Sequence, residues 1–257
     1  MNEKFYLGTY TKRVSKGVYS VTLNKETDQL ESLTLEAAID NPTYLSYSKS
    51  DQLLFAVGKG EEHCGISASN ALTSPVEPLA SIEDQQAVPC YIRYNEKTGD
   101  VLTANYHGGF VELYHYDKKD SAFTFVDKKV LSGFSVHANQ TSPHVHYTDY
   151  TPDEKWVVVC DLGIDIVFTY KRTEEGLEEV AQYKTKAGSG PRHLAFHPTL
   201  PIAYLICELD ATVEVLSYNQ ENGTFTNLDK IALTTEDQQA WGGAIHITRD
   251  GRFVYAS

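Results

Sequence analysis

A strand pair that recurs along the chain constrains its fold more than any other feature. Each copy begins at a proline, continues as a short alternating strand, turns on polar residues and returns as an apolar strand. Four copies cover residues 41–60, 88–109, 142–163 and 188–210. Their prolines, Pro42, Pro89, Pro143 and Pro191, are 47, 54 and 48 residues apart by subtraction. A fifth copy, over residues 241–257, has a glycine in place of the proline.

The spacing of the copies predicts a β-propeller. Two further strands joined by a hairpin turn follow the strand pair, as in residues 108–130 and 211–233. A period near 50 residues with about four strands per unit is typical of propeller blades. Residues 4–10, 17–23 and 30–37 predict three more strands at the start, and no segment has a helical period. We therefore predict an all-β chain, with residues 1–257 forming one β-propeller domain of about five blades.

The last copy stops directly after its apolar strand, at Ser257. A sheet that stopped there would leave an unpaired edge, which natural proteins avoid. We therefore expect that C-terminal blades, about two of them, are missing from this chain. The alternative is a closed five-bladed propeller in which the N-terminal strands complete the last blade.

Charge and composition exclude several classes of partner. The formal net charge is -13, and the 22 Lys and Arg residues are scattered. Nucleic acids and anionic membranes require a concentrated basic surface, so neither is a predicted partner. No apolar run approaches the roughly 18 residues of a membrane helix, and the N-terminus is too short and polar for a signal peptide, so we predict a cytoplasmic protein. Cys160 and Cys207 lie in apolar strands and are interpreted as core residues.

Polar residues differ between the copies at two equivalent places. After the proline the copies carry Thr43, Cys90, His144 and Arg192, and near the end of the second strand Gly58, Asn105, Asp161 and Glu208. In a propeller such positions surround the central channel, where ligands usually bind. The third and fourth copies are the richest in such side chains, with His144, His146, Arg192, His193 and Glu208.

Simpler interpretations of these residues remain open. Arg192 and Glu208 could form an ion pair that only closes one hairpin. The His-x-His pair at 144 and 146 lies on one strand face and could bind zinc, but no third ligand follows at close spacing, so no metal is predicted. His197 precedes a proline and is interpreted as a turn residue, whereas His107, His115 and His137 are interpreted as surface residues.

Residues 142–170 and 188–215 resemble the lactonase family of seven-bladed β-propellers. This family includes the bacterial propeller-type 6-phosphogluconolactonases and the fungal 3-carboxy-cis,cis-muconate lactonising enzymes. The motifs PHVH, DLG and GPRHLAFHP carry the resemblance, and YLGTYT, NPTYL, ANYHGGFVELY and IHITRDGRFVYAS extend it over the whole chain.

The resemblance implies a catalytic set of His146, Arg192 and Glu208. The family's second catalytic arginine belongs to an Asn-Arg-Gly motif that typically follows YAS, and the chain ends at that YAS, Tyr255 to Ser257. We expect His144, His193 and Asn105 to bind substrate, and we expect no cofactor.

Opening a lactone requires a polarised carbonyl, an activated water and, for a phosphorylated sugar lactone, cations for the phosphate. We therefore expect hydrolysis of a small anionic sugar lactone, 6-phosphogluconolactone of the pentose phosphate pathway. Arg192 would bind the substrate or its developing oxyanion, and Glu208 or His146 would be the general base. The alternatives are a muconate-type cycloisomerase, a calcium-dependent lactonase propeller and a propeller that only binds partners.

Overall fold

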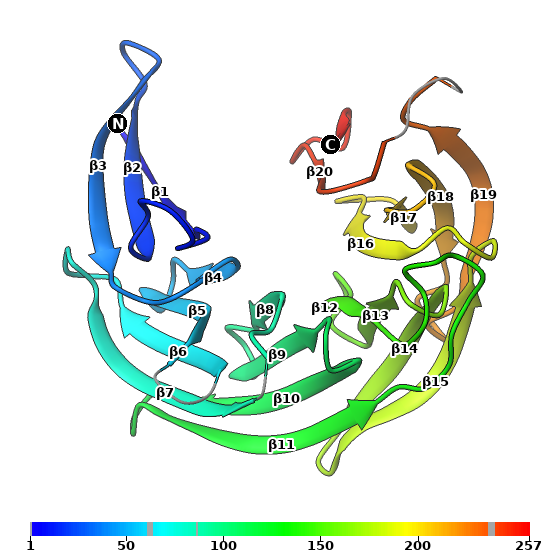
Figure 1. The fold of residues 1–257 in the computed structure, drawn as a ribbon, viewed down its shortest axis with the longest axis horizontal. Coiled ribbons are helices and arrows are strands. Elements are labelled where there is room, and N and C mark those ends of the chain that lie inside the picture. The colour runs from blue at the N-terminus through cyan, green and yellow to red at the C-terminus, as the bar shows by residue number, and fades with distance from the viewer. Residues whose placement is uncertain (1, 61–63, 86, 236–239) are drawn as a thin grey trace. The chain divides into compact units, whose positions relative to one another are not determined.

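The structure is a computed structural model that describes residues 2–60, 64–85, 87–235 and 240–257. Within these ranges the regular elements are all β-strands, β1 to β21 (Figure 1), which confirms the all-β prediction. None of the described residues forms a helix long and apolar enough to cross a bilayer.

The strands form six sheets in which neighbours along the chain are neighbours in the sheet (Figure 1). The first has three strands: β1 Glu3–Leu7, β2 Val18–Asn24 and β3 Gln29–Ala37. Two four-stranded sheets follow: β4 Leu45–Ser48, β5 Leu53–Lys59, β6 Cys64–Asn70 and β7 Glu77–Gln85, then β8 Tyr91–Tyr94, β9 Asp100–Asn105, β10 Phe110–Asp117 and β11 Ala122–Val130.

The remaining strands complete the series. The third four-stranded sheet comprises β12 Val145–Tyr150, β13 Val157–Asp161, β14 Ile166–Thr173 and β15 Gly176–Lys184. The fourth comprises β16 Pro191–Phe196, β17 Ile202–Cys207, β18 Thr212–Tyr218 and β19 Phe225–Ala232. The last two strands, β20 Ile245–Ile247 and β21 Val254–Ala256, pair with each other.

These sheets are the predicted propeller blades, and each repeat copy supplies the first two strands of one sheet. Among the described residues, strands β1–β3 form one sheet and β20–β21 another. The expectation that C-terminal blades are missing stays a prediction.

The chain divides into two compact units. Unit 1 comprises residues 1–103 and 114–125, and unit 2 comprises residues 104–113 and 126–257. The assignment of residues 1–257 to a single domain stays a prediction.

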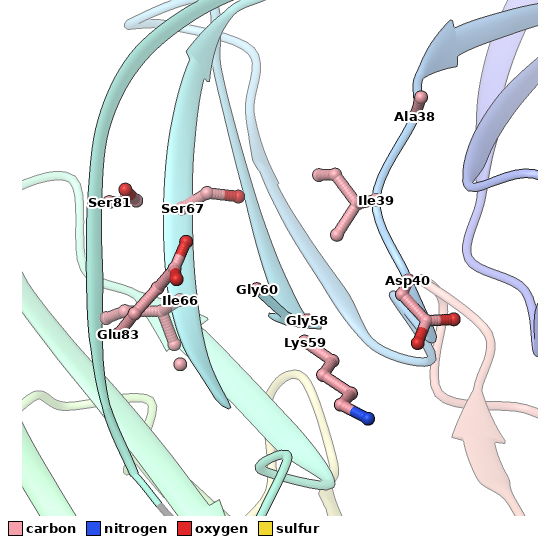
Figure 2. Close-up of a pocket in the computed structure, with 11 residues that line it drawn as sticks. Ala38, Ile39, Asp40, Gly58, Lys59, Gly60, Ile66, Ser67, Ser81 and Glu83 are labelled. Atoms are coloured by element: carbon pink, nitrogen blue, oxygen red, sulfur yellow. The ribbon is translucent and has the colours of Figure 1, made fainter. Parts of the chain in front are cut away.

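Aromatic residues from two sheets pack together in the core of unit 1. Phe55 is fully buried and lies 4.4 Å from the Tyr94 ring and 5.2 Å from the Tyr116 ring, centroid to centroid. Such offset and edge contacts stabilise a core beyond the burial of area alone. Unit 1 also contains a cavity of about 370 Å³ lined by Asp40, Lys59, Glu83 and neighbouring residues (Figure 2), none of which is a predicted site residue.

In unit 2 the strands β13 and β17, each the second of its sheet, lie in the core. All five residues of β13 are buried, and the last three of β17 are buried. Strands covered on both faces are continuously apolar rather than alternating, which explains the apolar run in each repeat copy. Cys160 and Cys207 are buried on these strands, as predicted. The outer strand β15 is largely exposed.

The same irregularity occurs where β12 and β16 begin. Val145 pairs with Asp161 and Tyr147 with Cys160, so His146 is an extra residue in the pairing register of the two strands. Arg192 is likewise the extra residue between Pro191, which pairs with Cys207, and His193, which pairs with Ile206. Each is a β-bulge, a local kink that redirects a side chain.

The bulges correct the alignment of the repeats made from their prolines. The N–H of Leu162 donates to the carbonyl of His144 at 3.0 Å, and the N–H of Glu208 donates to that of Gly190 at 2.8 Å. The structural equivalent of Arg192 is therefore His146 and not His144. Similarly, the equivalent of Glu208 is Leu162 and not Asp161. Pro143 lies two residues before the start of β12, whereas Pro191 is the first residue of β16, so the two prolines are not structurally equivalent.

Candidate active site

Four of the six predicted site residues form a continuous chain of contacts in unit 2. His146 Nδ1 lies 3.1 Å from His193 Nε2, and Arg192 Nη1 lies 3.5 Å from the same nitrogen. Arg192 Nε donates to Glu208 Oε2 at 2.8 Å. Because a guanidinium can only donate, Nε2 of His193 is the acceptor that faces Arg192. The proton between the two imidazoles therefore belongs to Nδ1 of His146.

The guanidinium of Arg192 is held in a defined orientation. Besides Glu208, it donates through Nη1 to the carbonyl of Gly243 at 2.7 Å. The side chains of Arg192 and Glu208 are 22% and 18% exposed, so small molecules can reach the pair. Within the described ranges Nη2 of Arg192 has no protein partner, and it is the nitrogen available to a substrate oxygen.

His144 has a fixed tautomer. Its Nδ1 lies 2.9 Å from the carbonyl oxygen of Tyr106, and its ring stacks on the Tyr106 ring at 4.2 Å with an interplanar angle of 6°. A carbonyl can only accept, so Nδ1 carries the proton and Nε2 of the neutral ring has the lone pair. In the part of the chain that the structure describes, no protein group occupies this Nε2.

Tyr106 connects His144 with the chain of contacts. Its ring meets the His146 ring edge-on, with 5.8 Å between centroids. Tyr106 follows β9, and sequence reasoning did not select it. The polar sequence Asn-Tyr-His directly after an apolar strand was the available signal.

Burial keeps the two inner histidines neutral. Burial, and secondarily the Arg192 charge, lowers the pKa of His146 to about 3. The same two effects, together with His146, hold the pKa of His193 well below its ordinary value. At neutral pH the charged groups of this cluster are therefore Arg192 and Glu208.

Asn105 and Asp161 use their side chains to close turns. Asn105 is fully buried and its Oδ1 accepts from the N–H of Gly108 at 2.8 Å. Asp161 Oδ1 accepts from the N–H groups of His144 at 2.7 Å and Gly163 at 2.9 Å. Polar residues at these strand ends therefore have a structural role, and the expectation that Asn105 binds substrate stays a prediction.

Other histidines lie outside this cluster of contacts. The Nδ1 of His197 accepts from the N–H groups of Thr199 and Leu200, which confirms its interpretation as a turn residue. Among the described residues, no three His, Cys, Asp or Glu side chains meet in a way that could hold a metal ion.

Comparison with known proteins decides the family. Residues 4–257 match the family described as Lactonase, 7-bladed beta-propeller. This chain belongs to the lactonase family. The predicted resemblance, and with it the prediction of a lactonase, are confirmed.

Relatives within the lactonase family share most of their length with this chain. A 6-phosphogluconolactonase of Bacillus subtilis is 36% identical over 257 residues, which cover 98% of this chain and 73% of the relative. A protein of Lactobacillus plantarum with a crystal structure is 35% identical, with a TM-score of 0.95, over all of this chain and 75% of that one. A periplasmic gluconolactonase of Pseudomonas aeruginosa is 27% identical, with a TM-score of 0.90, over all of this chain and 76% of that one.

Proposed function

We propose that this chain hydrolyses 6-phosphogluconolactone to 6-phosphogluconate, the reaction of the pentose phosphate pathway expected from its sequence. The observation that carries the proposal is that one unit contains both an oriented, accessible arginine, Arg192, and a histidine of fixed tautomer, His144. The 6-phosphogluconolactonase of Bacillus subtilis, 36% identical, supports the substrate. The cytoplasmic location expected from the sequence is part of the same proposal.

Arg192 is proposed to bind the lactone carbonyl. As water attacks the carbonyl carbon, negative charge develops on the oxygen, and a donor with a fixed direction stabilises this charge without having to reorganise. Nη2 of Arg192 is such a donor because the contacts of Nε and Nη1 fix the guanidinium. Glu208 then acts by holding Arg192 rather than by removing a proton.

His144 is proposed to be the general base, a role expected beforehand for Glu208 or His146. His144 Nε2 takes the proton of the attacking water. The protonated imidazole then delivers a proton to the lactone ring oxygen as its bond to the carbonyl carbon breaks, so protons balance. A base works best when its pKa is near the operating pH. His146, with a pKa of about 3, is too weak a base, and Glu208 is engaged by Arg192. His146 and His193 are proposed to support Arg192.

A second candidate substrate is an uncharged aldonolactone. Glu208 neutralises Arg192, and His146 and His193 are uncharged, so the described cluster has no net positive charge for a phosphate. The Pseudomonas aeruginosa relative is described as a gluconolactonase, which agrees with this candidate. The muconate cycloisomerase, calcium-dependent lactonase and pure binding alternatives have no observation in their favour here.

The test is the rate of lactone hydrolysis with 6-phosphogluconolactone generated in a coupled assay. The chain should accelerate hydrolysis well above the spontaneous rate, and Arg192→Ala and His144→Gln should each lower kcat/KM by about 100-fold or more. His197→Gln, which changes a turn histidine outside the cluster, should retain full activity and serves as the matched control. No acceleration by a folded wild-type chain would refute the proposal.

A further inference from the structure

Two glycines shape the loop that leads into Arg192. Gly188 and Gly190 have φ angles of 88° and 67°, in the left-handed region that favours glycine. Ser189, between them, is fully buried. This loop, residues 186–190, precedes β16 directly, so its position determines where the bulge at Arg192 begins.

Both glycine N–H groups point at one carboxylate. Gly190 donates to Asp165 Oδ1 at 2.7 Å and Gly188 donates to Asp165 Oδ2 at 2.8 Å. Alternating backbone N–H groups that converge in this way form an anion-binding concavity, and bonds to a charged acceptor are stronger than neutral ones. The hydroxyl of Ser135 also donates to Oδ2.

Asp165 is a buried acid without a cationic partner. The residue is 5% exposed, and within the described residues no lysine or arginine pairs with it. Burying a carboxylate is costly unless hydrogen bonds compensate, and here the compensation comes from the loop itself. The carboxylate and the loop therefore depend on each other.

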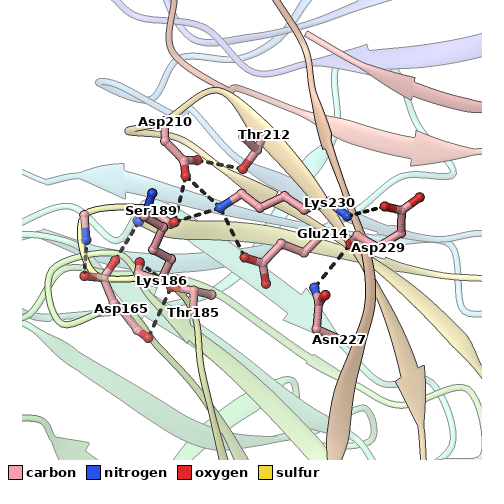
Figure 3. Close-up of polar contacts among 12 residues, drawn as sticks. Asp165, Thr185, Lys186, Ser189, Asp210, Thr212, Glu214, Asn227, Asp229 and Lys230 are labelled. Carbon is pink, nitrogen blue, oxygen red and sulfur yellow. Dashed lines mark hydrogen bonds and ion pairs between the residues drawn. The ribbon is translucent and has the colours of Figure 1, made fainter.

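The other side of the loop is held by its own sheet. Ser189 Oγ donates to Asp210 Oδ2 at 2.7 Å, and Lys230 Nζ bonds both Ser189 Oγ at 3.0 Å and Asp210 Oδ2 at 2.8 Å. Figure 3 shows Ser189 between Asp165 on one side and Asp210 with Lys230 on the other. The loop is thus fixed from two directions.

Gly190 transmits this constraint to the ion pair. Its carbonyl accepts the N–H of Glu208 at 2.8 Å, and Arg192 follows two residues later. Asp165 lies in the turn between β13 and β14, in the sheet that carries His146. A shift of Gly190 would therefore move Arg192 and Glu208 together, relative to the histidines of the preceding sheet.

We propose that Asp165 is a positioning residue that sets the distance between the Arg192–Glu208 pair and the histidines of the preceding blade, His144 and His146. The proposal rests on the proposed function for its effect on rate. Misplacing reacting groups by about 1 Å can cost on the order of 100-fold in rate. Loss of both N–H bonds should therefore lower kcat more than it changes KM.

The test compares Asp165→Ala, Asp165→Asn and Ser135→Ala in the full chain. Asp165→Ala should lower kcat by about 10- to 100-fold. Asp165→Asn should fall in between, because its amide oxygen still accepts one N–H bond. Ser135→Ala removes a hydrogen bond from the same carboxylate but leaves both loop bonds in place, so its kcat should stay near that of the wild type.

A second readout does not depend on any substrate. Hydrogen exchange at the amides of Gly190 and Glu208 should accelerate in Asp165→Ala, and less in Asp165→Asn, while Ser135→Ala leaves it unchanged. Unchanged exchange in a folded Asp165→Asn variant, or an equal loss of kcat in Ser135→Ala, would overturn the positioning role. If the wild type hydrolyses no lactone, the proposed function fails, but the exchange result still decides whether Asp165 orders the loop.

Discussion

Replacement of Glu208 by glutamine separates the two candidate substrates. Glutamine keeps the volume and an acceptor oxygen for Arg192 Nε, which lies 2.8 Å from the carboxylate. It removes one negative charge, so the cluster changes from neutral to a net charge of about +1. Because the two side chains are 22% and 18% exposed, the loss of the ion pair should lower stability by only about 1 kcal/mol.

The magnitude of the specificity change follows from Coulomb's law. For a substrate phosphate about 6 Å from the altered charge, with an effective dielectric constant of about 40, the interaction is roughly 1.4 kcal/mol. This corresponds to about a tenfold change in affinity. An uncharged lactone should not sense this change.

The assay measures kcat/KM for 6-phosphogluconolactone and for gluconolactone with wild type and Glu208→Gln. Any loss from a poorly oriented Arg192 affects both substrates and cancels in their ratio. The ratio should shift about tenfold toward the phosphorylated lactone at low ionic strength, and the shift should shrink with added salt. Glu221→Gln, an exposed carboxylate in the turn before β19, is the charge-matched control. An unchanged ratio in Glu208→Gln would refute the placement of a phosphate near this pair.

Three further predictions concern stability. Burial raises the pKa of Asp161 from 3.8 to about 6, so the contribution of the protonated Asp161 to stability is lost as the pH rises from 3.8 through 6. Asp161→Asn, which keeps Oδ1, should therefore raise the free energy of unfolding by about 1 kcal/mol at pH 7.5 but not at pH 4. Thermal melts that show no such pH-dependent gain would contradict this. The pKa of His146 is lowered from 6.5 to about 3, so the contribution of neutral His146 to stability is complete above pH 6.5 and is lost as the pH falls below it. Urea unfolding should show a free energy of unfolding lower by up to about 2 kcal/mol at pH 5, and this loss should be smaller in His146→Gln. Gly190 has a φ of 67°, and a Cβ at this position would lie 2.7 Å from Leu209 Cγ. Gly190→Ala should therefore lower the free energy of unfolding, measured by chemical denaturation, by about 1–3 kcal/mol. A neutral result would mean that the loop can relax.

The strand pattern was predictable because it depends on local chemistry. The apolar strand expected in the fourth repeat copy is β17, Ile202–Cys207, since a central strand covered on both faces has little freedom in composition. The proximity of Arg192 and Glu208 could also be predicted, because a hairpin brings its two ends together.

The finer geometry was not predictable. Pro143 precedes the first residue of β12 by two positions, whereas Pro191 is itself the first residue of β16, so counting from the prolines aligned His144 rather than His146 with Arg192. The carbonyls of Tyr106 and Gly243 that contact His144 and Arg192 are backbone groups, which no side-chain pattern reveals. Asp165 was missed because its partners are N–H groups of a distant loop.

The matched bulges at His146 and Arg192 have a consequence for how such a protein can change its chemistry. A bulged residue has no cross-strand partner, so its replacement breaks no pairing in the ladder. Two adjacent blades thus have equivalent bulge positions, one occupied by the imidazole of His146 and the other by the guanidinium of Arg192. Substitutions at these two positions, in evolution or by engineering, could change an acid, a base or a charge in the site while the supporting sheets stay intact.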